Sequence, residues 1–136
     1  MAKFKTLFNR REVLLAGAAT LLPLPALAIE NTGVILVGAS WCSVCKQAAP
    51  ILALLSEQGQ FPVLVASHDA RPIPPFPDVV SSLENPLTSD ITTFPVTMVY
   101  ASAQNAVVGR VDGFRNPKWY MRAVASMINQ AEAGQG

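Results

Sequence analysis

The residues most able to do chemistry are Cys42 and Cys45, which form a Cys-x-x-Cys pair. They are the only cysteines among the 136 residues, and two residues separate them. They lie between an apolar segment at 34–39, which is predicted to be a strand, and a helical pattern that begins near Ser43. At a helix N-terminus, unpaired backbone N–H groups and the positive end of the helix dipole favour a thiolate on the first cysteine. The placement therefore predicts a redox dithiol.

Other uses of a Cys-x-x-Cys pair have to be weighed against this reading. The chain has no second cysteine pair for a zinc site, and Lys46 rather than histidine follows Cys45, so the haem-attachment pattern is missing. A Cu(I)-binding module for copper delivery stays open as an alternative, because thiolates are soft ligands, with His68 or Met98 as the third ligand. A purely structural disulfide is disfavoured, because so short a loop constrains the unfolded chain little.

Residues 1–28 have the pattern of a secretory signal peptide. A basic region ending at Arg11 is followed by an apolar region at 13–27, and Ala-Leu-Ala at 26–28 is a small-x-small cleavage site. The apolar region is too short and too proline-interrupted for the roughly 20 residues of a membrane span, so we expect cleavage after Ala28 and no stable span. An uncleaved anchor is the alternative.

The arginine pair, Arg10 and Arg11, resembles the twin-arginine export signal. Asn9 stands where serine or threonine is usual, and no basic residue follows Leu14, so the general secretory route remains open. Both routes lead out of the cytoplasm. We therefore expect the protein in the periplasm, where disulfides persist.

Residues 29–136 suit one small α/β domain. The whole chain is 51% hydrophobic and 14% charged, as expected for a packed core. Its net charge of +1 comes from the leader, and the basic residues of the remainder are scattered, so we expect no nucleic-acid partner. We also expect a monomer that holds no metal.

The predicted elements of this domain are strand, helix, strand, proline-rich loop with a short helix, a two-stranded hairpin and a closing helix. Their ranges are 34–39, 43–58, 61–66, 71–83, 94–100 with 107–111, and a helix that follows Asn116-Pro117. The short helix is predicted at 78–83. Pro50 lies inside the first helix and is expected to kink it, and Asn116 is the expected N-cap of the last.

With these elements in order, residues 29–136 resemble the thioredoxin superfamily over nearly their whole length. The matching features are Trp41 before Cys42-x-x-Cys45-Lys46, Pro50 five residues after the second cysteine, Phe94-Pro95 before the hairpin, and Gly113 before the closing helix. The resemblance implies a thioredoxin-like α/β fold in one domain, with a central mixed β-sheet flanked by helices.

The resemblance also implies thiol–disulfide exchange. Cys42 would be the nucleophile and Cys45 the resolving cysteine, with their own disulfide as the redox group and no other cofactor. The partners would be protein thiols and disulfides in the periplasm, together with an upstream redox donor or acceptor.

The substrate groove follows from the same resemblance. Pro95 would be the family's cis-proline, facing the cysteines, and Phe94 would offer backbone groups to an extended substrate chain. Trp41 is expected to pack beside the site, and Ser43 and Val44 to contact substrate.

Two departures from the family pattern matter. Leu36 stands at the position of the buried acid of thioredoxins, and the second strand has no lysine, so the proton acceptor for Cys45 is not inherited. His68 or Asp69 is the candidate, with a plain surface histidine as the alternative. The residues between the cysteines match neither reducing nor oxidising relatives; the small domain favours a reductant.

The proline-rich segment 71–78 is the last open feature, since it lengthens the connection before Pro95 beyond that of a minimal thioredoxin. It is expected either to select a partner or to be a tolerated surface loop.

Overall fold

The computed structural model describes residues 32–135, and the predicted signal peptide lies outside them. Five strands form one sheet in the order β3-β2-β1-β4-β5. They are β1 (Thr32–Gly38), β2 (Val63–Ser67), β3 (Val80–Ser81), β4 (Val96–Ala101) and β5 (Ala106–Asp112). β1, β2 and β3 run parallel, whereas β4 is antiparallel to both β1 and β5. The mixed sheet confirms the predicted fold class.

β1 is the central strand because its side chains are apolar on both faces. Val34 and Leu36 pack into a core cluster on the helix side, whereas Ile35 and Val37 pack into a second cluster on the opposite side. The strand ends at the buried Gly38, directly before the loop that carries the cysteines.

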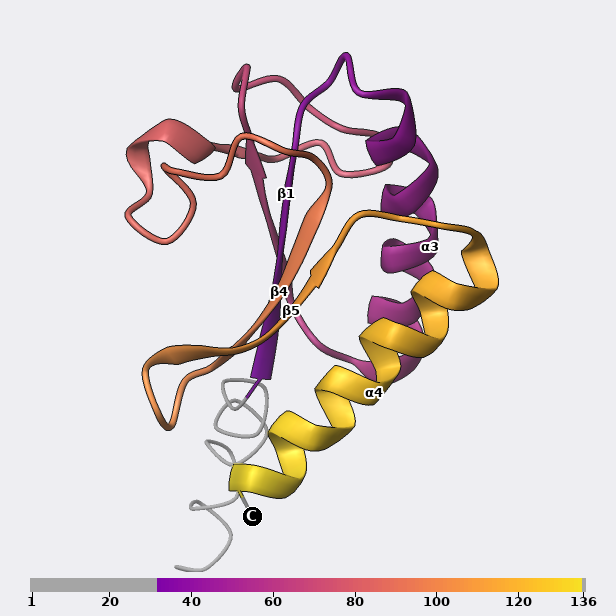
Figure 1. The fold of residues 1–136 in the computed structure, drawn as a ribbon, viewed down its shortest axis with the longest axis vertical. Coiled ribbons are helices and arrows are strands. Elements are labelled where there is room, and N and C mark those ends of the chain that lie inside the picture. The colour runs from indigo at the N-terminus through magenta and orange to yellow at the C-terminus, as the bar shows by residue number, and fades with distance from the viewer. Residues whose placement is uncertain (1–31, 136) are drawn as a thin grey trace, which may run out of the picture. The chain divides into compact units, whose positions relative to one another are not determined.

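Two helices, α3 (Ser43–Gly59) and α4 (Pro117–Gln135), cover one face of the sheet (Figure 1). α3 continues through Pro50 as one helix. At the start of α4, the side chain of Asn116 accepts a 2.8 Å hydrogen bond from the backbone N–H of Trp119, which confirms the predicted N-cap.

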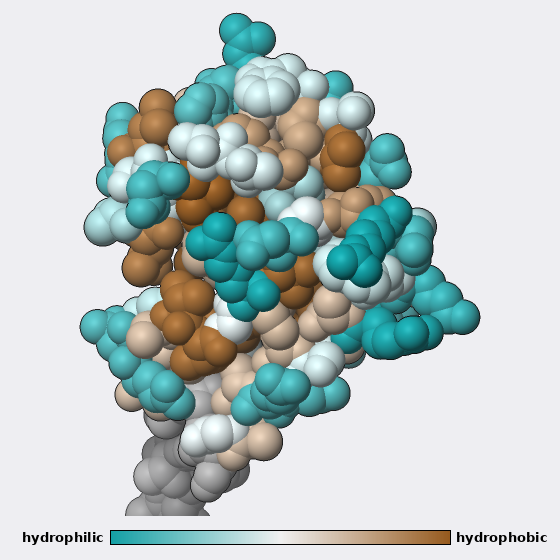
Figure 2. Space-filling view, in the orientation of Figure 1, coloured by the Kyte–Doolittle hydropathy of each residue, from teal (hydrophilic) through white to brown (hydrophobic). Residues whose placement is uncertain are grey.

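The other face is covered by the segment that follows β3, including a 3-10 turn, η1 (Ser82–Glu84) (Figure 1). Ile91 of this segment is buried against the second core cluster. The helix predicted at 78–83 is wrong over most of its length, because Val80 and Ser81 form β3, which pairs with the end of β2, and only residues 82–83 belong to the 3-10 turn. Cover is incomplete, and Figure 2 shows apolar side chains exposed between this segment and the β4–β5 hairpin.

One buried polar pair joins α4 to the sheet. The hydroxyls of Thr97 on β4 and Tyr120 on α4 lie 2.6 Å apart, and both residues are fully buried. Burial raises the pKa of Tyr120 to about 12, against the lowering effect of the hydrogen bond with Thr97. Within residues 32–135, neither helix combines the length and hydrophobicity that a membrane span requires.

Candidate active site

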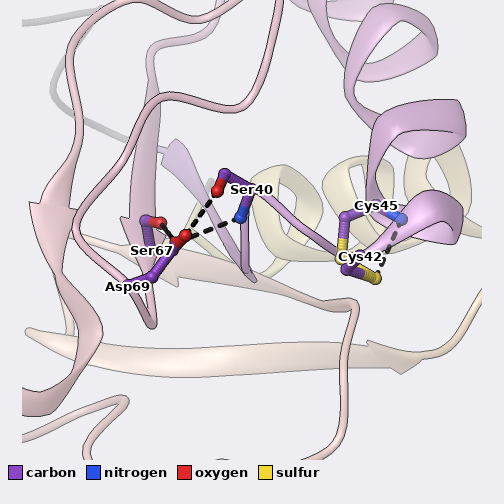
Figure 3. The surroundings of a disulfide bond; sticks show 5 residues. All are labelled: Ser40, Cys42, Cys45, Ser67 and Asp69. Atoms are coloured by element: carbon purple, nitrogen blue, oxygen red, sulfur yellow. Dashed lines mark hydrogen bonds between the residues drawn. A yellow bond between two sulfur atoms is a disulfide. The ribbon is translucent and has the colours of Figure 1, made fainter.

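The cysteine pair forms a disulfide at the N-terminus of α3, with the two Cα atoms 5.2 Å apart (Figure 3). Cys42 is the N-cap residue, and its sulfur accepts a 3.2 Å hydrogen bond from the backbone N–H of Cys45. Cys45 is fully buried, whereas Cys42 is partly exposed. The helix start thus provides the N–H groups that stabilise negative charge on the exposed sulfur.

Gly38 makes room for the buried sulfur. A Cβ atom added to Gly38 would lie 2.9 Å from Sγ of Cys45 and 3.3 Å from its Cβ. Any other residue at this position would therefore push against the cysteine, so the end of β1 and the first turn of α3 depend on each other.

An aromatic row lies beside the disulfide. The ring of Phe94 is 6.0 Å from that of Trp41 in an edge-on arrangement, and 5.3 Å from that of His68. The Phe94–Pro95 peptide bond is cis, the isomer that the resemblance implied. Trp41 keeps 62% of its surface exposed, so it forms part of the outer surface near the cysteines.

The two residues between the cysteines differ in exposure. Ser43 is exposed and Val44 is half-buried at the start of α3. Their contact with substrate stays a prediction.

Asp69 binds two serines, Ser40 and Ser67. Its carboxylate accepts hydrogen bonds from the backbone N–H of Ser40 at 3.1 Å, from the Ser40 hydroxyl, and from the Ser67 hydroxyl at 2.8 Å. Figure 3 shows the carboxylate directed at these two serines, with the disulfide at the other end of the connection from Ser40 to Cys42. Asp69 thus ties the loop before the cysteines to the end of β2.

These contacts determine the charge of Asp69. Partial burial raises its pKa, but the hydrogen bonds from Ser40 and Ser67 outweigh this and hold the pKa well below the ordinary value of 3.8. A carboxylate held in this way is a poor proton acceptor. These contacts place Asp69 as an anchor of the Ser40 loop and argue against it as a base for Cys45, a role that stays an untested prediction.

We expect Asp69→Asn to lower the free energy of unfolding at pH 7 by about 1 kcal/mol, because the amide cannot accept all three hydrogen bonds and solvent screens the partly exposed site. The folded pKa is depressed, so the stabilisation is fully present above the ordinary pKa of 3.8, declines below it, and is lost only as the pH falls through the lower folded pKa. Urea unfolding at pH 7 and pH 3 measures this.

The matched control is Asp78→Asn, the same change at an exposed aspartate. Two results would contradict the role of Asp69 as an anchor. One is a difference in unfolding free energy between wild type and Asp69→Asn that is equal at both pH values, and the other is a difference no larger than that for Asp78→Asn.

His68, the other candidate acceptor, is linked to the end of β1 and to the ring of Phe94. Its backbone N–H donates a 2.7 Å hydrogen bond to the carbonyl of Gly38, the residue that packs on Cys45. Its Nδ1 atom is buried and has no hydrogen-bond partner among the described residues. Histidine is thus brought to the site as predicted, and its role there stays a prediction.

The copper alternative needs a third ligand, and Met98 is badly placed for it. Met98 belongs to the core cluster of Ile35 and Val37, on the face of the sheet opposite the cluster that contains Cys45. Within residues 32–135, no group of three or more His, Cys, Asp or Glu side chains is arranged to hold a metal.

Three residues near the site were missed by sequence reasoning. Ser40 and Ser67 hold Asp69, and Ile73 of the proline-rich segment is fully buried in the cluster of Cys45. For Ile73, the local signal was an isolated apolar residue among prolines. Ser67 lies only two positions before Asp69, so its contact is local, whereas Ser40 lies 29 positions away and no local pattern points to it.

The fold and the bonded cysteine pair define a thioredoxin-like protein, and solved structures agree on the fold. The chain matches a putative thiol:disulfide interchange protein DsbE from Chlorobium tepidum with TM-score 0.60, 17% identity, and 79% of this chain and 84% of that chain covered. For a thioredoxin pre-protein of Schistosoma mansoni, the values are 0.55, 22%, 82% and 89%.

A family model narrows the class. The model described as "TraF: F plasmid transfer operon protein" matches residues 26–111, more than half of the chain, and the chain belongs to this family. The matched range contains both cysteines and the cis-proline. No curated protein matches the chain in sequence.

Proposed function

We propose that the protein is a thiol–disulfide oxidoreductase that acts on protein disulfides in the periplasm. The observation that carries the proposal is the asymmetry of the cysteine pair. Cys45 is fully buried, whereas Cys42 is partly exposed and its sulfur receives an N–H from the helix start. A protein substrate can therefore reach one sulfur, and the other can be reached only through the first.

The exchange proceeds in two balanced steps. The Cys42 thiolate attacks a substrate disulfide, forming a mixed disulfide and releasing one substrate thiolate. The Cys45 thiolate then attacks Sγ of Cys42, which forms the Cys42–Cys45 disulfide and releases the second substrate thiolate. Two electrons pass to the substrate, and an upstream donor returns them to the protein. No other cofactor takes part in this scheme.

In this scheme the proton of Cys45 passes to His68. The support is its backbone link to Gly38 beside the buried sulfur, and a buried Nδ1 without a partner in the described part of the chain.

Substrate recognition uses the surface around Cys42. An extended chain lies against the backbone of Phe94 and the cis-Pro95, where strand-like hydrogen bonds give affinity without demanding one sequence. Trp41 offers exposed apolar surface beside this substrate chain, and Ser43 and Val44 lie on either side of the substrate disulfide that Cys42 attacks.

The location and direction rest on other observations. Residues 1–28 have the pattern of an export signal, with the arginine pair favouring the twin-arginine route, and one matching structure is named a pneumococcal exposed lipoprotein thioredoxin. We propose a monomeric reductant. Its reduction potential should then lie near that of thioredoxin, about −270 mV, and a value near that of the oxidant DsbA, about −120 mV, would reverse the direction.

The test is to trap partners in the periplasm. We expect Cys45→Ser to accumulate proteins bound to Cys42 as adducts that dithiothreitol releases, because the resolving attack is lost. The double variant Cys42→Ser/Cys45→Ser is the control and should trap none. Absence of adducts with stoichiometric copper on the purified wild type would favour the copper-delivery alternative, and absence of both would reject the proposed function.

A further inference from the structure

The proline-rich segment 71–78 has one fully buried side chain, that of Ile73. Ile73 is fully buried, whereas Pro74 and Pro75 are exposed. The backbone N–H of Phe76 donates a 2.9 Å hydrogen bond to the carbonyl of Ile73, and these two residues form an isolated antiparallel bridge. The segment is thus a tight turn that buries Ile73 completely and packs Phe76 partly against the same core cluster.

The side chain of Ile73 ends beside the resolving sulfur. The point where a Cβ of Gly38 would lie is 3.2 Å from Cδ1 of Ile73 and 2.9 Å from Sγ of Cys45. Both atoms therefore border the same small space above Gly38. Ile73 and Cys45 also belong to one core cluster, against which Cys42, Phe76 and Phe94 pack.

We propose that Ile73 is a positioning residue for Cys45, closing the pocket that holds the resolving sulfur; the proposal rests on the proposed thiol–disulfide exchange. It assigns the proline-rich segment to the redox site, in place of partner selection or a tolerated loop. Leu36 and Ile73 together make this surrounding apolar at the point where thioredoxins carry an acid.

The pocket acts differently on the two redox forms. In the oxidised form, a covalent bond holds Sγ of Cys45 in place. In the reduced form, only packing holds the Cys45 thiol close to Cys42, and the apolar wall keeps water away from it. Shortening Ile73 therefore lets the Cys45 side chain of the reduced form move and meet water, which the covalent bond prevents in the oxidised form. The disulfide–dithiol equilibrium then shifts toward the dithiol.

The measurement is the equilibrium of the purified full-length protein with glutathione, in which two glutathione thiols are oxidised as the protein disulfide is reduced. Ile73→Val removes only Cδ1, a change that folded cores tolerate. We expect it to shift the equilibrium constant toward the dithiol by about two- to fivefold, and Ile73→Ala by about tenfold, from the size of the lost contacts.

The matched control is Ile128→Val, which deletes the same methyl group in the same core cluster. Ile128 lines a groove with Leu55 and Gly59, at the end of α3 opposite Cys45. The Ile128→Val substitution should lower the stability of both redox forms equally and leave the glutathione equilibrium unchanged.

The outcomes separate the two proposals. If wild type exchanges with glutathione and Ile73→Val matches wild type and the Ile128→Val control, the role of Ile73 is rejected while the proposed function stands. If the wild-type disulfide does not exchange at all, both are rejected.

Discussion

Replacing Cys42 with serine is expected to reduce catalysed insulin disulfide reduction to its background rate, a loss of about a thousandfold or more. A serine hydroxyl is not ionised near neutral pH and cannot form a disulfide, so the first step has no nucleophile. The assay follows insulin precipitation with dithiothreitol as electron donor. Loss of so short a disulfide loop changes stability little, so circular dichroism should show a retained fold.

Two further variants make this result specific. Ser102→Ala changes an exposed residue in the β4–β5 turn and should keep the wild-type rate. Cys45→Ser should attack insulin once and then stop as a mixed disulfide, so it loses turnover but not the first thiolate released. Wild-type turnover by Cys42→Ser would show that the dithiol does not perform the exchange.

Gly38→Ala is expected to lower the free energy of unfolding of the oxidised protein by about 1–3 kcal/mol. The added methyl group would lie 2.9 Å from Sγ of Cys45 and 3.2 Å from Ile73, closer than ordinary contacts allow. The sulfur is held by its bond to Cys42 and cannot swing away, so the backbone of β1 or α3 has to shift. Chemical denaturation of the oxidised and reduced forms measures the change.

The same strand offers a matched control. A Cβ added to Gly33 would meet Pro62 at 3.6 Å, an ordinary contact, so Gly33→Ala should be close to neutral. We expect the loss in Gly38→Ala to be larger in the oxidised form, since the free thiol can move aside. Equal stability of the two alanine variants would show that the space above Gly38 is not restrictive.

Local sequence patterns predicted most of the elements. The ends of the strands differ from the predicted ranges by one or two residues, as at β2, predicted from 61 and observed from Val63. The failure at 78–83 has a physical cause. The pairing of Val80 and Ser81 with the end of β2 decides their conformation, and such a contact is not visible in a short stretch of sequence.

Asp69 illustrates the same limit at the site. Its position at the end of β2 predicted that it would lie near the active edge of the sheet, which is where it lies. Its partners depended on how the loop at Ser40 folds back over β2. That contact disfavours Asp69 as a base, because a carboxylate that accepts several hydrogen bonds is stabilised as an anion.

The sequence by itself determined the dithiol, its place at a helix start and the proline that directly precedes β4, because these depend on residue type and on short spacings along the chain. The family resemblance implied that Cys42 is the attacking sulfur, and tertiary structure alone decided what surrounds the buried Cys45. Gly38 and Ile73 meet at Cys45 only after β1, α3 and the proline-rich segment pack together. Packing at a few ångströms depends on the whole fold, and no local pattern records it.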